Sequence, residues 1–164
     1  MKVYIIAAMT ADGFIARGSN ELINWTSPED KKFFRETTNA SGVVLMGGNT
    51  YRTFKSPLPG RRNIVYSHRK IDDISVETTQ ENPFELVKRL GSEGVNELAV
   101  IGGSTIYTLF VKAGLVTDIY LSIEPKIFGN GIKLFNEDLD VELSLVDSKN
   151  LNKNTLLLHY RVAN

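Results

Sequence analysis

Cysteine is absent from the 164-residue chain, which excludes disulfides, zinc–thiolate sites, thiolate catalysis and iron–sulfur clusters. Histidine occurs only twice, and we expect no metal site. An excess of either charge is also missing, because 19 lysines and arginines balance 19 aspartates and glutamates. A neutral chain has no overall field that would attract nucleic acid or an anionic membrane. We therefore expect a small-molecule ligand, and the lack of cysteine favours a cytoplasmic location.

Long apolar runs are missing as well. The longest near the N-terminus, residues 3–9, is too short to span a bilayer and passes directly into the turn signal Asp12-Gly13. We interpret it as a core strand and not as a signal peptide. The sequence contains no G-x-G-x-x-G, Walker A, G-x-S-x-G or H-E-x-x-H motif, so the common nucleotide-binding and hydrolase signatures are excluded.

The apolar runs that are present predict an α/β fold. A length of 164 residues corresponds to about one domain. Runs rich in β-branched residues at 3–9, 43–47, 63–67 and 97–103 are typical of strands covered on both faces of a parallel sheet. Helices are expected at 28–38 and 83–91, each beginning with a capping residue and a proline, and from Gly103 to about Lys112. Three further strands, at 118–128, 141–151 and 155–162, have no helix between them and should pair antiparallel. The prediction is a mostly parallel central sheet flanked by helices, with a C-terminal antiparallel hairpin.

Asp30 is the first candidate functional residue. It follows Trp25 by five positions and shares a helix face with Phe34. A carboxylate beside aromatic walls could bind a flat, amidine-like edge through two charge-assisted hydrogen bonds. The alternative is structural, since Asp30 is also the acid three residues after Ser27 that would complete a helix cap.

Three further signals are ambiguous in isolation. Paired glycines at 47–48 and 102–103 each stand between a strand and a helix, where they suit either tight packing or a phosphate held by the helix start. The basic segment at 67–70 follows a strand, at the edge where ligands of α/β sheets bind, or it is a solvated loop. Arg61 follows the turn at 57–60 and could equally be a surface residue.

Six segments in order carry a resemblance to a known family. They are IIAAMTADGFIA (5–16), WTSPEDKKFFRETT (25–38), VVLMGGNTY (43–51), PLPGRRNIVYS (57–67), AVIGGSTIY (99–107) and DIYLSIEPKIFGNG (118–131). Together they resemble the dihydrofolate reductase family from about residue 2 to residue 162. The resemblance implies NADPH-dependent reduction of dihydrofolate to tetrahydrofolate, a step of one-carbon metabolism and tetrahydrofolate biosynthesis, by a monomer or homodimer.

The resemblance also implies roles for individual residues. Asp30 would be the buried acid that binds the pterin edge and promotes protonation of N5, with Trp25 anchoring a water beside it and Ser122 orienting it. The implied substrate-binding residues are Ala7, Ala8, Phe34, Phe54, Leu58 and Arg61, of which Arg61 would pair with the α-carboxylate of the glutamate tail. The implied NADPH-binding residues are Ala8, Ile15, Gly47, Gly48, Asn49, Thr50, Ser67, His68, Arg69, Ile101, Gly102, Gly103, Ser104, Thr105, Ile106 and Tyr107. The Gly102–Gly103 peptide is expected to be cis, as in the family.

The sequence departs from the family in three places. Gly48 stands where family members often carry an arginine, so His68, Arg69 or Lys70 would have to contact the 2′-phosphate of the cofactor. The loop at 16–25 has an unusual length and lacks the usual proline before Trp25. The phrase ADGFIA at 11–16 is similar to riboflavin-pathway reductases, which share the fold and cofactor. Such a reductase, a paralogue of unknown substrate and a non-catalytic binding protein are therefore the alternatives.

Overall fold

A central sheet organises the fold. The computed structural model describes residues 1–19 and 21–163, and within them eight strands form one sheet in the order β5-β4-β3-β6-β1-β7-β10-β9. These strands are β1 (Lys2–Thr10), β3 (Val43–Gly47), β4 (Arg62–Tyr66), β5 (Val76–Thr79), β6 (Glu97–Gly102), β7 (Asp118–Glu124), β9 (Leu143–Asn150) and β10 (Leu156–Val162). A separate two-stranded sheet joins β2 (Phe14–Ala16) to β8 (Ile132–Lys133). The helices are α1 (Pro28–Ser41), α2 (Gly48–Phe54), α3 (Pro83–Ser92) and α4 (Ser104–Lys112).

The fold class predicted from the sequence is confirmed. All neighbours from β5 to β7 are parallel, and β10 pairs antiparallel with both β7 and β9. Both predicted caps are also present: Ser27 Oγ accepts from the Asp30 N–H at 3.2 Å, and Asn82 Oδ1 accepts from the Phe84 N–H at 2.9 Å. Each cap is followed by a proline, whose fixed φ suits the first helical position.

The expectation that successive C-terminal strands pair is only half right. β9 and β10 form a hairpin, but β10 and not β9 lies beside β7. The connection from β7 carries β8, so it is long enough to place β9 at the outer edge of the sheet. β7 ends at Glu124, four residues earlier than predicted, because Pro125 cannot donate to a ladder. The sequence pattern did not predict β2, β5 or β8, which are only two to four residues long.

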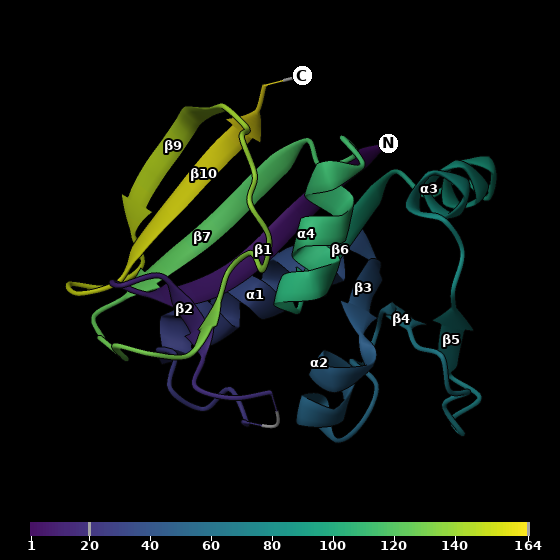
Figure 1. Ribbon diagram of the computed structural model, residues 1–164, viewed down its shortest axis with the longest axis horizontal. Coiled ribbons are helices and arrows are strands. Elements are labelled where there is room, and N and C mark those ends of the chain that lie inside the picture. The colour runs from purple at the N-terminus through teal and green to yellow at the C-terminus, as the bar shows by residue number, and fades with distance from the viewer. Residues whose placement is uncertain (20, 164) are drawn as a thin grey trace.

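Successive side chains of the inner strands point to opposite faces of the sheet, and each face is the base of one hydrophobic core. Val3 and Ile5 of β1 face α3 and α4, whereas Tyr4 and Ile6 face the side covered by α1. Figure 1 shows α4 in front of the sheet and α1 behind it. The Tyr4 hydroxyl donates to the backbone oxygen of Thr37 at 3.2 Å and so fixes α1 against the strand. In the part of the chain that the structure describes, no helix is long and apolar enough to cross a membrane.

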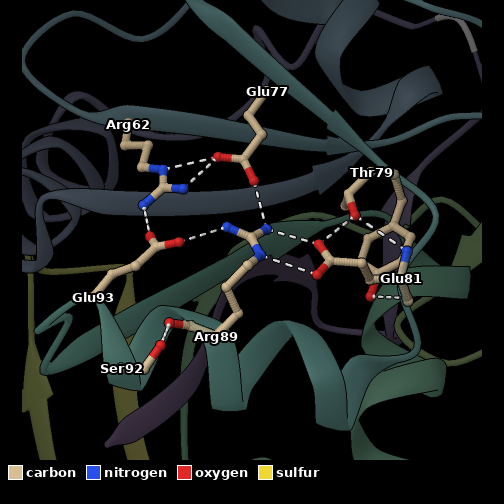
Figure 2. A network of polar contacts seen from close by, with 8 residues as sticks. Arg62, Glu77, Thr79, Glu81, Arg89, Ser92 and Glu93 are labelled. Atoms are coloured by element: carbon tan, nitrogen blue, oxygen red, sulfur yellow. Dashed lines mark hydrogen bonds and ion pairs between the residues drawn. The ribbon is translucent and has the colours of Figure 1, made fainter.

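An ion-pair network fastens α3 to the β4–β5 edge of the sheet (Figure 2). The Arg89 guanidinium donates to three carboxylates: to Glu77 at 2.6 Å, to Glu81 at 2.7 and 2.9 Å, and to Glu93 at 3.0 Å. Arg62 of β4 bridges Glu77 and Glu93 from the other side. The bonds from Arg89 hold the pKa of Glu81 below its ordinary value. A network of this kind stabilises more than isolated surface pairs do.

We expect Arg89→Met to lower the free energy of unfolding by about 1–2 kcal/mol, because charge-assisted bonds to three carboxylates are lost while most of the side-chain stem is kept. Urea unfolding followed by circular dichroism measures the change. The matched control is Lys88→Met on the same helix, since Lys88 is exposed and has no ion-pair partner among the described residues. Equal losses in both variants would show that the network contributes nothing.

Candidate active site

A cavity of about 810 Å³ opens where the parallel strands end. Its walls come from the carboxyl ends of β1, β3 and β6, the first turns of α2 and α4, and one face of α1. Ligands of open α/β sheets bind at this edge. Nineteen of the residues implied by the family resemblance line it: Ala7, Ala8, Ile15, Asp30, Phe34, Gly47, Gly48, Asn49, Thr50, Phe54, Ser67, His68, Ile101, Gly102, Gly103, Ser104, Thr105, Ile106 and Tyr107.

Asp30 presents its carboxyl group to this cavity from the first turn of α1 and is only 8 % exposed. Burial raises the pKa of Asp30, hydrogen bonding from the Ser122 and Thr26 hydroxyls opposes the shift, and the charge of Glu124 adds to it. Across the cavity, burial and the charge of Asp30 raise the pKa of Tyr107, whose hydroxyl donates to the backbone oxygen of Ile6 at 3.0 Å. A carboxyl group in this setting can bind a ligand edge or carry a proton.

The Asp30 carboxylate takes no part in the hydrogen bonds that cap α1. In a capping box the acid at the third position accepts from the N–H of the capping residue. Here Ser27 N–H donates at 2.8 Å to Glu124 Oε1, a carboxylate from β7, and Asp30 contributes only its backbone N–H to the cap. The structural alternative for the Asp30 side chain is therefore wrong.

Trp25 and Ser122 lie outside the cavity lining. Ser122 is 2 % exposed and supplies a hydroxyl to Asp30. The Trp25 ring is buried and packs edge-on against Phe128, with ring centroids 5.1 Å apart. Its indole N–H is buried and has no hydrogen-bond partner among the described residues. Ser122 therefore supports the acid from outside the cavity lining, whereas the described ring contact of Trp25 is with Phe128.

An aromatic wall continues from Asp30 along α1. Phe34 and Phe54 are stacked, with ring centroids 6.3 Å apart and planes inclined by 15°. Leu58 packs in the same cluster but does not line the cavity. The buried Asn63 side chain fixes the backbone at Leu58 by two hydrogen bonds of 2.9 Å. It accepts from the Leu58 N–H and donates to the Leu58 carbonyl. The wall suits a flat, apolar ligand.

Arg61 lies outside the cavity lining, beside the far end of α1. Its Nη1 donates to Thr38 Oγ1 at 2.7 Å and its Nε to the carbonyl of Pro59 at 3.0 Å. Burial, and then the charge of Arg35, lower the pKa of Arg61. Arg35 places a second positive charge near Arg61, and an anionic group would be stabilised beside them. Arg35 was not among the predicted site residues.

Three of the four paired glycines leave little room for a side chain. A methyl group on Gly47 would lie 3.1 Å from Ile106 Cγ1, and one on Gly102 or Gly103 would lie 3.2 Å from Thr50 Oγ1. The Gly102–Gly103 peptide is cis, as expected. Ser104 Oγ, in the first turn of α4, is buried without a hydrogen-bond partner among the described residues. Bare backbone, a helix start and an unpaired hydroxyl together fit a phosphate-bearing dinucleotide.

The basic segment divides between the cavity and the surface. Ser67 and His68 line the cavity, whereas Arg69 and Lys70 do not. A different cation is present: Arg52 of α2 lines the cavity, and a methyl group on Gly48 would lie 3.6 Å from both Arg52 Nη1 and Ser67 Oγ. Arg52 was not among the site residues predicted from the sequence, although its position one helical turn after Gly48 places it on the same side of α2.

Comparisons with known proteins agree with this geometry. The family model described as dihydrofolate reductase matches residues 2–142. The chain belongs to the dihydrofolate reductase family. A dihydrofolate reductase of Neisseria gonorrhoeae is 32 % identical over 132 residues, which cover 78 % of each protein. Membership identifies the chain as a reductase, as predicted from its sequence.

The fold of this chain is also similar to that of two solved structures. RibD of Acinetobacter baumannii superposes with a TM-score of 0.85 over 99 % of this chain and 58 % of that protein, at 16 % identity. A Thermotoga maritima deaminase and 5-amino-6-(5-phosphoribosylamino)uracil reductase gives 0.79 over 99 % and 56 %, at 18 % identity. At such identities the likeness shows the fold that these proteins share with the dihydrofolate reductase family.

The raised pKa of Asp30 predicts a pH-dependent cost in stability. The folded protein binds this proton more tightly than the unfolded chain, whose Asp has its ordinary pKa of 3.8. Stability is therefore lost as pH rises from that value through the folded pKa. We expect Asp30→Asn to unfold at higher urea concentration than the wild type at pH 7, and the two midpoints to converge near pH 3. A difference that is independent of pH would contradict this.

Proposed function

We propose that the protein reduces 7,8-dihydrofolate to 5,6,7,8-tetrahydrofolate with NADPH, in one-carbon metabolism. A hydride adds to pterin C6 and a proton adds to N5, which reduces the C6–N5 double bond. The observation that carries the proposal is the Asp30 carboxyl, buried in the wall of a cavity that has stacked aromatic rings on one side and bare glycine backbone on the other.

The side chains of this chain have distinct tasks in that reaction. Asp30 accepts hydrogen bonds from the amidine-like edge of the pterin, which orients the ring, and promotes protonation at N5. Its raised pKa keeps it protonated to higher pH than a solvated aspartate. Phe34 and Phe54 pack against the ligand and exclude water from the reacting face. Arg61, with Arg35 beside it, pairs with the carboxylate of the glutamate tail.

The end of the cavity lined by the paired glycines would hold the cofactor. Gly102, Gly103 and the start of α4 would receive the diphosphate, with Ser104 Oγ as one of its donors. When bound, NADPH supplies the hydride; the protein supplies position and exclusion of water. We assign the 2′-phosphate to Ser67, His68 and Arg52, which line the cavity beside Gly48.

The riboflavin-pathway pyrimidine reductases are the second candidate. Their support is the fold of the solved structures and the segment at 11–16. Asp30 and Arg61 favour dihydrofolate, because a phosphoribosyl-aminouracil has neither the 2-amino-pyrimidine edge that a carboxylate binds nor a glutamate tail.

The function is tested by following NADPH oxidation at 340 nm with dihydrofolate and with the aminouracil substrate in parallel. We expect turnover with dihydrofolate only, and a fall of roughly 10²-fold or more in Asp30→Asn, because general-acid assistance is lost. Turnover with the aminouracil alone would establish the second candidate. Tight folate binding without oxidation would identify a binding protein, and full activity of Asp30→Asn would remove the acid from the mechanism.

Arg61→Ala should weaken dihydrofolate binding by about 1.5–3 kcal/mol, since a charge-assisted pair with the tail carboxylate is lost. Fluorescence titration measures the dissociation constants of dihydrofolate and of a pterin without the glutamate. The truncated pterin should bind wild type and variant equally. If both ligands lose affinity to the same extent, Arg61 acts on the pocket through Thr38 and not on the tail.

Arg52→Ala should bring the Michaelis constants for NADPH and NADH closer together, because a cation next to the 2′-phosphate is removed. Arg69→Ala is the matched control and should have the smaller effect, since Arg69 lies outside the cavity lining. The wild-type preference should shrink as salt exceeds about 0.1 M, where the screening length falls to about 10 Å. Equal use of NADH and NADPH by the wild type at low salt would refute the assignment.

A further inference from the structure

Glu124 is a buried carboxylate with no part in the reaction proposed above. It ends β7, two residues after Ser122, and is 2 % exposed. Three donors converge on it: Ser27 N–H and Ser27 Oγ at 2.8 Å on Oε1, and Thr155 Oγ1 at 3.1 Å on Oε2. No lysine, arginine or histidine among the described residues forms an ion pair with it. An acidic group so deeply buried without a cation is costly and requires an explanation.

The contacts of Glu124 explain how Asp30 is kept available. Ser27 N–H would otherwise be the natural partner of the Asp30 side chain, three residues further on. Glu124 Oε1 takes that N–H, and Ser27 Oγ, which donates to the same oxygen, accepts from Asp30 N–H at 3.2 Å. A relay thus runs from the backbone of Asp30 through Ser27 to Glu124. It fixes the first turn of α1 while the Asp30 carboxyl remains directed into the cavity.

We propose that Glu124 is a positioning residue for Asp30. Glu124 takes the place of the Asp30 side chain in the helix cap and adds a second negative charge behind the Asp30 carboxyl. The proposal rests on the proposed function, in which Asp30 is the acid. Positioning follows from the hydrogen bonds, and the electrostatic part follows from the burial of both residues on either side of Ser27.

The charge of Glu124 favours the protonated form of Asp30. After burial itself, it is the group that raises the pKa of Asp30. The other groups that face Asp30 are the Ser122 and Thr26 hydroxyls and Lys31, all of which lower this pKa, and Tyr107 across the cavity. Removing the charge at 124 should therefore let Asp30 lose its proton at lower pH.

Two variants separate position from charge. Glu124→Gln keeps an oxygen that can accept from Ser27 but removes the charge, whereas Glu124→Leu removes both. We expect Glu124→Gln to bind dihydrofolate within a few-fold of the wild type, while the high-pH limb of its kcat/KM profile moves to lower pH. We expect turnover of Glu124→Leu to fall toward that of Asp30→Asn, because Asp30 is then free to cap Ser27.

Carboxyl ¹³C NMR gives a readout that needs neither substrate nor cofactor. The Asp30 carboxyl should titrate at lower pH in Glu124→Gln than in the wild type. Asp118→Asn is the control, because Asp118 lies on the same strand but bonds His159 and Thr117, and it should leave the Asp30 titration unchanged.

The outcomes distinguish this inference from the proposed function. Identical Asp30 titrations in wild type and Glu124→Gln would overturn the inference even if the enzyme reduces dihydrofolate. Absence of dihydrofolate reduction in the wild type would overturn the proposed function, while a shifted Asp30 titration would still show the coupling of the two carboxyls.

Discussion

A carboxyl group removed from water must either keep its proton or find partners that compensate for the lost hydration. The Asp30 carboxyl is removed from water in this way, and the groups around it determine whether its protonated or its charged form is favoured. The hydroxyls of Ser122 and Thr26 support the charged form, while burial and Glu124 support the neutral one. The sheet contributes by placing β7 next to β1, so that polar side chains at the end of β7 face the first turn of α1. The acid site depends on this balance, and the cavity walls decide what the acid meets.

The two halves of the cavity favour ligands through different interactions. Around Asp30 the wall is made of side chains, in particular the stacked rings of Phe34 and Phe54, and it selects for shape and apolar surface. Around Gly47 and Gly102 the wall is made of backbone and helix starts, and it selects for negative charge. A ligand pair with one flat ring system and one phosphate-bearing partner matches this division.

The sequence predicted the central strands and the capped helices because their signals are local. The run at 43–47 and the Ser27-Pro28 cap specify their structures within a few residues. It also predicted that Asp30 and Phe34 share a face, because helical spacing is fixed. It could not predict that β10 inserts between β7 and β9, since strand order depends on contacts between distant segments. Glu124 was missed for the same reason, because its neighbour Ser27 is brought close only by the fold.

The contacts of the β9–β10 turn have a consequence for the order in which the molecule is assembled. Thr155 at this turn bonds Glu124, and Asn152 donates to Glu29 of α1 at 3.0 Å. Both partners precede the turn in the chain, so an emerging polypeptide can form most of the parallel sheet before either bond exists. During synthesis the acid site would thus be completed by the hairpin, after the glycine-lined end of the cavity at Gly102 has already been made. A shortened chain that ends before Thr155 would retain the residues of the cavity wall and yet leave the support of its acid unfinished.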